Sequence, residues 1–186
     1  GRWEVMHDHH GPVLRPVEID ADQLDPVWNP AAAEFVAAAN AVFANGGFRI
    51  TPHIVKEIHD NKNKVIANSA VPKAGDENIR AIDPRNAWLM DSMLRDVTLF
   101  GTAARASAQL KRRDLAGKTG TTNDYYDAWF CGYQATVAGC AWMGYDQPKK
   151  LGSRETGGVA ALPIWIAYMQ TALRGVPEQI PSPPSG

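Results

Sequence analysis

The residues best suited to chemistry lie together in one short stretch, Gly117-Lys118-Thr119-Gly120-Thr121. An apolar lead-in and the turn residues that follow predict a strand that ends in a loop. Thr119 and Thr121 lie two residues apart, so in a strand their side chains point the same way. The two hydroxyls, the Lys118 ammonium and an open backbone edge suit a carboxylate and a peptide carbonyl. Gly120 places no side chain in the path of a ligand.

Further short motifs surround this stretch in a fixed order. They are Ala41–Pro52 (AVFANGGFRITP), Ser92–Val97, Gly101–Ala103, Asp127–Phe130, Gly132-Tyr133, Trp142–Asp146, Glu155–Gly158 and Ala161–Trp165. Lys-Thr-Gly alone also occurs at ordinary strand ends, but it is the third motif of the serine penicillin-binding proteins and β-lactamases, beside S-x-x-K and S-D-N. Taken in order, the motifs closely resemble the C-terminal part of the transpeptidase domain of class A penicillin-binding proteins, from about Ala33 to about Arg174.

The resemblance implies an acyl-transfer reaction. In the family, the serine of S-x-x-K attacks the D-Ala-D-Ala end of a peptidoglycan stem peptide, and an amine from a second strand completes the crosslink. β-Lactam antibiotics mimic the peptide and stop at the acyl-enzyme. Carried over to this sequence, Lys118 is the catalytic residue, and Thr119, Gly120 and Thr121 bind the substrate. The threonine hydroxyls take the carboxylate, and the Thr121 backbone N–H forms half of an oxyanion hole.

Two of the three catalytic motifs of that family do not occur in the chain. No serine stands in an S-x-x-K or an S-x-N pattern. Ser92 is followed by Arg95 at the lysine position, and an arginine cannot act as a base. Because both motifs precede the matching region in the family, we expect the nucleophile in an upstream part of the same domain. That upstream part is therefore an expected partner, and the chain alone is expected to be inactive.

Two alternatives to a transpeptidase stay open. A D,D-carboxypeptidase or serine β-lactamase-like hydrolase would carry the same Lys-Thr-Gly strand, although Glu155–Gly158 and Ala161–Trp165 favour the transpeptidase. A non-catalytic interaction module could also retain the scaffold. An S-x-x-K motif upstream in the same gene would separate the enzymes from the module.

Composition excludes several other classes of function. The chain has 186 residues, enough for one domain, and a formal net charge of −1, so there is no electrostatic case for nucleic acid. It contains no apolar run long enough to span a membrane. His7-Asp8-His9-His10 lacks the spacing of a metal site, so we expect a polar turn there and neither a metal nor a cofactor. The resemblance implies a parent protein at the periplasmic face of the bacterial inner membrane, with a glycosyltransferase domain before this soluble segment.

The apolar patterns predict an α+β fold, an antiparallel sheet covered by helices that resembles the penicillin-binding protein and serine β-lactamase fold and is expected to be incomplete. Helices are predicted at 30–45, 84–100, 103–110 and 159–173, and strands at 48–58, 64–67, 115–121, 128–134 and 137–145. Residues 1–29 form an unassigned segment that could hold an accessory hairpin. Residues 30–175 are the C-terminal part of the transpeptidase domain, and 176–186 a disordered tail.

Several finer expectations follow from the same patterns. One apolar face is predicted on each of the first two helices, formed by Phe35, Ala39, Val42 and Phe43 in the first, and by Leu89, Met90, Met93, Leu94, Val97 and Phe100 in the second, and both faces are expected to be buried. Lys111–Arg113 is predicted to be a solvated basic loop. A turn at Ala135-Thr136 would place Cys131 directly opposite Cys140, with Cα atoms about 4.5 to 5.5 Å apart. The two cysteines are expected to be neighbouring thiols.

Overall fold

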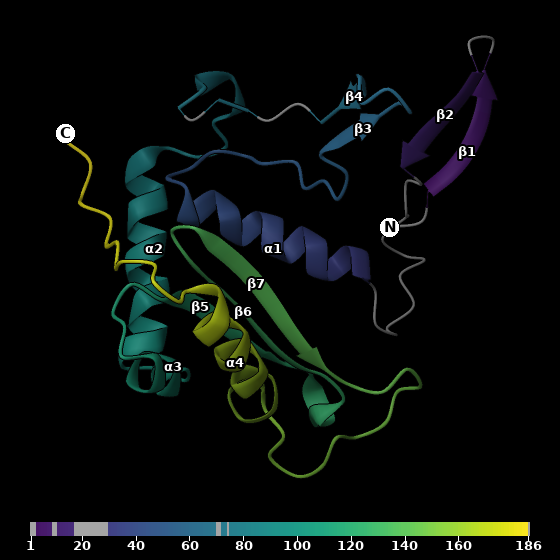
Figure 1. Cartoon of the computed structure of the whole chain (residues 1–186). Helices are drawn as coiled ribbons and strands as arrows, with labels where there is room; N and C mark the ends of the chain where they lie inside the picture. Colours follow the sequence, from purple (N-terminus) through teal and green to yellow (C-terminus); the bar gives the residue numbers. More distant parts are fainter. Residues whose placement is uncertain (1–2, 9–10, 17–29, 70–71, 74, 186) are drawn as a thin grey trace.

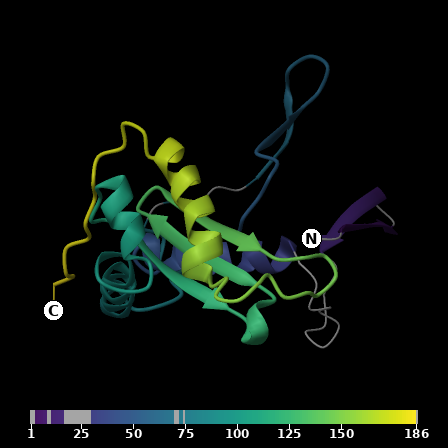
Figure 2. The same cartoon turned by 90° about the horizontal axis from the view of Figure 1, so that it is seen from below.

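The protein is built around an antiparallel sheet with helices on both faces (Figures 1 and 2). The structure is a computed structural model that describes all residues except 1–2, 9–10, 17–29, 70–71, 74 and 186. The elements in chain order are β1 (Trp3–Asp8), β2 (Gly11–Pro16), α1 (Pro30–Ala44), β3 (Glu57–His59), β4 (Val65–Asn68), the short 3₁₀ helix η2 (Glu77–Ile79), α2 (Pro84–Leu99), α3 (Ala104–Leu110), β5 (Ala116–Thr121), the 3₁₀ turn η3 (Asn123–Tyr125), β6 (Ala128–Gln134), β7 (Val137–Met143), the π-helical turn η4 (Gly157–Ala161) and α4 (Leu162–Ala172). The α+β prediction is confirmed.

The main sheet has the strand order β5-β6-β7, and both pairings are antiparallel. Gln134 pairs with Val137, so the predicted turn at Ala135-Thr136 is confirmed. The Gln134 side-chain oxygen accepts hydrogen bonds from the backbone N–H and the hydroxyl of Thr136, at 2.9 and 2.8 Å. These bonds fix the turn, and with it the register of the whole hairpin.

One face of the sheet forms the core with α4. The Phe130 ring meets the Trp165 ring edge-on, with centroids 4.9 Å apart. The apolar face of the last helix is buried, at Leu162, Trp165, Ile166, Met169 and Leu173. Trp165 also donates its indole N–H to the Gly139 carbonyl at 3.1 Å, so α4 is fixed to β7 by a directed bond as well as by packing.

The predicted burial of α2 is confirmed only in part. Val97 packs against the core, and Met90 and Leu94 are half-buried. Leu89, Met93 and Phe100 are 51%, 55% and 79% exposed. Its buried residues are Ala87, Asp91 and Thr98. Phe35 of α1, also predicted to be buried, is 76% exposed. Hydrophobicity therefore accounts for only part of the orientation of these two helices in the described part of the chain.

Polar contacts also orient α2. Asp91 accepts hydrogen bonds from Arg95 at 2.8 Å and from the Tyr133 hydroxyl of β6 at 3.2 Å. Thr98 donates its hydroxyl to the Leu115 carbonyl at the start of β5. Burial raises the pKa of the Tyr133 phenol, and the negative charge of Asp91 raises it further, so this phenol stays a donor. Because unpaired buried polar groups are costly, this network helps to decide which face of α2 is buried.

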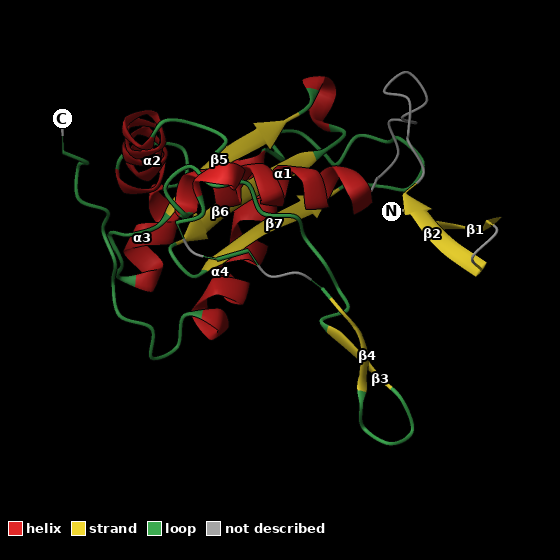
Figure 3. Ribbon diagram, turned by 90° about the horizontal axis from the view of Figure 1, so that it is seen from above, coloured by secondary structure: helices red, strands yellow, loops and turns green. Residues whose placement is uncertain are grey.

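The segment before α2 differs from the predicted long strand at 48–58. Phe48 forms only an isolated bridge with Arg80, and a short exposed hairpin of β3 and β4 follows. This hairpin projects away from the main sheet (Figure 3). Asp60 closes its turn by accepting from the backbone N–H groups of Lys62 and Lys64. With so few paired residues and Pro52 in the run, the predicted strand cannot continue.

The N-terminal hairpin is present, since β1 and β2 pair antiparallel over their whole length. They form a sheet of their own, so within the described residues they do not extend the β5-β6-β7 sheet. His9 and His10 lie outside the described residues. No helix in the described part of the chain is long and apolar enough to cross a membrane.

The prediction that Lys111–Arg113 is a solvated basic loop is wrong for Arg112. Its guanidinium is only 11% exposed and pairs with the fully buried carboxylate of Asp114 at 2.7 Å. Arg112 also donates to the backbone carbonyls of Val176 and Pro177. Part of the segment predicted to be disordered is thus held in place. Two further bonds run from the Trp88 indole to the Pro181 carbonyl and from the Gln179 N–H to Asp114.

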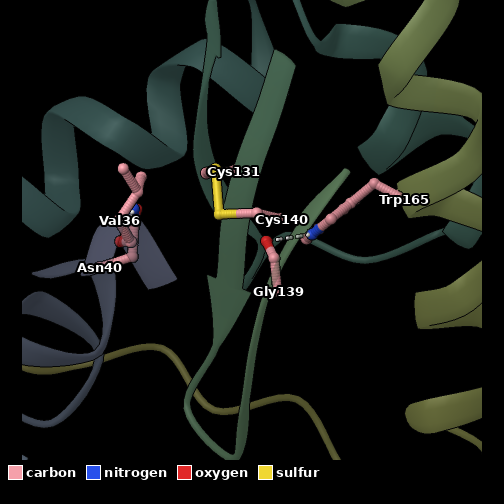
Figure 4. The surroundings of a disulfide bond; sticks show 6 residues. All are labelled: Val36, Asn40, Cys131, Gly139, Cys140 and Trp165. Carbon is pink, nitrogen blue, oxygen red and sulfur yellow. Dashed lines mark hydrogen bonds between the residues drawn. A yellow bond between two sulfur atoms is a disulfide. The ribbon is translucent and has the colours of Figure 1, made fainter. Parts of the chain in front are cut away.

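The cysteines lie as the register predicts, but they are not free thiols. Cys131 and Cys140 are directly opposite in β6 and β7, with Cα atoms 4.1 Å apart, and they form a disulfide. Figure 4 shows this bond between the neighbouring strands, with Val36 and Asn40 of α1 nearby. The expectation of two thiols assumed that direct cross-strand bridges are unfavourable. The close approach of this pair brings the two sulfurs together instead.

Reducing this disulfide is expected to lower the free energy of unfolding by about 2 to 3 kcal/mol. The bond closes a short loop, with a sequence separation of 9, and loop closure in the unfolded chain predicts a stabilisation of this size. Urea unfolding with and without a dithiol reductant measures the effect. The double variant Cys131→Ala/Cys140→Ala is the control, because its midpoint should not respond to the reductant. Equal midpoints for the oxidised and reduced chain would contradict the prediction.

Candidate functional site

The predicted site residues lie on β5, the strand at one edge of the main sheet. Within the described residues β5 pairs only with β6, so its other edge is not occupied by a strand. Burial falls along the strand: Ala116 and Gly117 are buried, whereas Lys118 and Thr121 are exposed. The start of β5 is therefore fixed in the core and its end presents functional groups to solvent.

The register assigns the site residues to the two faces of β5. Thr119 is opposite Phe130 and Thr121 opposite Ala128, so both threonines lie on the face covered by α4, as their spacing predicts. Lys118 is opposite Cys131 and lies on the other face, in register with the disulfide. The sequence therefore predicts the shared direction of the threonines correctly.

Hydrogen bonds bring Lys118 back to the threonine side. The Lys118 ammonium donates to the Thr119 carbonyl at 2.8 Å, and its nitrogen lies 3.4 Å from the Thr119 hydroxyl oxygen. None of the ion pairs in the described part of the chain involves Lys118. The ammonium is therefore available to an anion that binds next to Thr119.

The Thr121 hydroxyl already has one partner. Its oxygen accepts the backbone N–H of Gly157 at 3.0 Å. A hydroxyl carries one proton and can also accept, so this bond leaves the Thr121 proton free for donation. The Thr119 hydroxyl oxygen lies 3.0 Å from the hydroxyl oxygen of Thr102, and either could be the donor.

The turn η4, before α4, packs closely against the backbones of β5 and β6. A Cβ added to Gly157 would lie 2.1 Å from the Trp129 carbonyl oxygen and 2.5 Å from that of Gly120. One added to Gly158 would lie 2.9 Å from the Thr102 carbonyl oxygen. Only glycine allows η4 to approach the backbones of β5 and β6 so closely. Analysis of the sequence missed these contacts, although the paired glycines before an apolar helix were a signal of close packing.

Comparison with known proteins decides the family. Residues 31–168 match the family model described as the penicillin binding protein transpeptidase domain. The chain belongs to this transpeptidase family. It covers part of the transpeptidase domain of a class A penicillin-binding protein, a family of cell wall synthesis.

Two relatives show how much of the transpeptidase the chain covers. It is 46% identical over 140 residues to penicillin-binding protein 1A of Neisseria gonorrhoeae, and 44% identical over 151 residues to that of Neisseria lactamica. These alignments take 75% and 81% of the chain, but only 17% and 19% of the relatives. The chain thus spans less than a fifth of the length of these relatives.

Solved structures show the same fold. The crystal structure of penicillin-binding protein 1A from Haemophilus influenzae matches 80% of the chain and 27% of its own length, with a TM-score of 0.70 and 34% identity. Penicillin-binding protein A from M. tuberculosis, solved as an imipenem acyl-enzyme complex, matches 74% of the chain and 30% of its own length. Its TM-score is 0.51 at 24% identity, which supports the transpeptidase fold alone.

Proposed function

We propose that the end of β5 recognises the C-terminal carboxylate of a stem peptide ending in D-Ala-D-Ala, and the equivalent carboxylate of β-lactams. The observation that carries this proposal is the meeting of the Lys118 ammonium with the Thr119 hydroxyl, beside Thr121 on the same face of an unpaired edge. Hydroxyl and ammonium donors form the strongest hydrogen bonds with an ionised acceptor.

The spacing of the threonines suits a carboxylate. Residues two apart in a strand are about 6 to 7 Å apart, a gap that a carboxylate bridges with one bond of about 2.7 Å to each hydroxyl. Lys118 adds a positive charge at the Thr119 end. Gly120 between the two threonines leaves the edge open for the peptide backbone. The Thr121 N–H would then lie near the scissile carbonyl and supply half of an oxyanion hole.

The covalent step requires groups from outside this chain. Acyl transfer needs an activated nucleophile, and the sequence holds neither S-x-x-K nor S-x-N. We infer that an upstream part of the same domain supplies the serine, its activating lysine and the other half of the oxyanion hole. The complete protein would then be a D,D-transpeptidase that acts at the periplasmic face of the inner membrane.

Replacing Lys118 with alanine is expected to weaken carboxylate binding about tenfold to hundredfold. A charge-assisted hydrogen bond contributes about 1.5 to 3 kcal/mol, and each 1.4 kcal/mol is a factor of ten. The measurement is a nuclear magnetic resonance titration of the labelled chain with N-acetyl-D-Ala-D-Ala, with the methyl ester of the same peptide as a neutral control.

Lys62→Ala is the matched control, because Lys62 lies in the β3–β4 hairpin, away from β5. It should leave binding unchanged. Equal affinity of Lys118→Ala and the unchanged chain would remove Lys118 from the site. If the acid and the ester bind equally well, carboxylate recognition itself is wrong.

A further inference from the structure

Beside the proposed carboxylate site lies a hydroxyl to which neither the sequence nor the comparisons give a role. Thr102 follows Gly101 in the turn between α2 and α3, and its hydroxyl oxygen lies 3.0 Å from that of Thr119. The Lys118 nitrogen lies 3.4 Å from the same Thr119 oxygen. The Thr119 hydroxyl thus has two neighbours: the Lys118 ammonium, which can only donate a hydrogen bond, and the Thr102 hydroxyl, which can donate or accept one.

Backbone contacts fix Thr102 in this place. The N–H groups of the residues on either side of it bond back to α2, from Gly101 to the Asp96 carbonyl at 3.0 Å and from Ala103 to the Val97 carbonyl at 3.0 Å. Ala103 is fully buried in the core. On the other side, Gly158 approaches the Thr102 carbonyl so closely that a Cβ there would lie 2.9 Å away. The hydroxyl is therefore presented to Thr119 by a fixed turn.

The direction of the Thr102–Thr119 hydrogen bond decides whether Thr119 can donate to a ligand. A threonine hydroxyl has one proton to donate and two lone pairs that accept. If Thr119 donates to Thr102, it has no proton left for a ligand. If Thr102 donates to Thr119, the Thr119 proton is free. An ionised carboxylate can only accept, so its binding requires the second arrangement.

We propose that Thr102 is a positioning residue for carboxylate recognition, whose hydroxyl donates to Thr119 and so directs the Thr119 proton to the bound carboxylate. In this arrangement the Thr119 hydroxyl accepts hydrogen bonds from Thr102 and Lys118 and donates one to the ligand. Its two lone pairs and its one proton are then all used. The proposal rests on the proposed function of β5 and adds to it a residue that does not touch the ligand.

The test uses the chain as it stands, titrated with N-acetyl-D-Ala-D-Ala and with its methyl ester. Thr102→Val keeps the shape of the side chain and removes the hydroxyl. It should weaken binding of the acid about threefold to tenfold, the effect of one hydrogen bond, and leave any binding of the ester unchanged. Thr102→Ser restores a hydroxyl and should restore the affinity for the acid. Thr171→Val, at an exposed position of α4, is the matched control and should have no effect.

Each other outcome overturns the proposal. Equal affinities of Thr102→Val and the unchanged chain, with Lys118→Ala still impaired, would remove Thr102 while leaving the proposed function intact. A loss in Thr102→Val that serine does not restore, or that affects acid and ester alike, would show that Thr102 only supports the fold. If the unchanged chain does not bind the acid, the proposed carboxylate site fails, and the role of Thr102 fails with it.

Discussion

Replacing Arg112 with alanine is expected to lower the free energy of unfolding by about 3 to 5 kcal/mol, the usual cost of leaving one partner of a buried ion pair alone. Asp114 is the partner left behind, and its carboxylate is fully buried. Arg112 reaches it through two bonds, of 2.9 Å and 2.7 Å. Gln134 and the Gln179 N–H also donate to Asp114, but neither brings a positive charge.

The same ion pair makes stability depend on pH. Burial alone would raise the pKa of Asp114, but hydrogen bonds from Arg112, the Gln179 N–H and Gln134 outweigh it and hold the pKa below its usual value. A depressed folded pKa contributes stability above the unfolded pKa of about 3.9, and this contribution is lost as the pH falls through the lower folded value. Arg112→Ala removes the hydrogen bond and the charge of Arg112, so the pKa of the buried Asp114 carboxyl rises and this carboxyl takes up a proton at a higher pH than in the unchanged chain. The difference in stability between the two proteins should therefore shrink as the pH falls from neutral through about 4 toward the lower folded pKa of the unchanged chain.

Urea unfolding of both proteins between neutral pH and pH 3 measures the two effects. Arg113→Ala is the matched control, because Arg113 is exposed in the same loop and uses its backbone N–H, not its guanidinium, to bond Glu178. Removing the Arg113 side chain should lower the free energy of unfolding by well under about 1 kcal/mol. The prediction is wrong if both variants lose a similar amount of unfolding free energy. It is also wrong if the loss of unfolding free energy in Arg112→Ala does not change with pH.

Local patterns were enough to predict the sheet and its register. The strands predicted at 128–134 and 137–145 have only two residues between them, so a turn at Ala135-Thr136 allows one hairpin register, and this register places Cys131 against Cys140. The two-residue period of a strand puts Thr119 and Thr121 on one face of β5. The apolar face of α4 also follows from its period, because that helix packs on the sheet that the pattern predicts.

Contacts between distant residues could not be predicted in this way. Asp91 and Tyr133 are 42 residues apart, and their bond holds the Asp91 side of α2 against β6. Thr102 and Thr119 are 17 residues apart, and nothing in the spacing of either motif indicates that their hydroxyls meet. The sequence pattern of a helix predicts an apolar face, but the elements that pack against the helix decide which face is buried.

The chain alone is expected to form no covalent adduct with penicillin. Removing the nucleophile of a serine hydrolase costs about a millionfold in rate, so residual chemistry would be invisible. The β5 residues can hold a carboxylate, but acyl transfer needs an activated serine, and no serine of the chain stands in an S-x-x-K pattern. Intact-mass spectrometry after incubation with a labelled penicillin is the direct measurement.

Two controls make the result decisive. Penicillin-binding protein 1A of Haemophilus influenzae should be labelled stoichiometrically under the same conditions. The heat-denatured chain reports slow, non-specific acylation of surface amines. A stoichiometric adduct on a serine of the folded chain, absent from the denatured one, would mean that the chain holds a nucleophile outside an S-x-x-K pattern. Labelling that appears only when a separate upstream fragment is added, and that falls on the fragment's serine, would show that β5 supplies the carboxylate site of a domain whose reactive serine lies elsewhere.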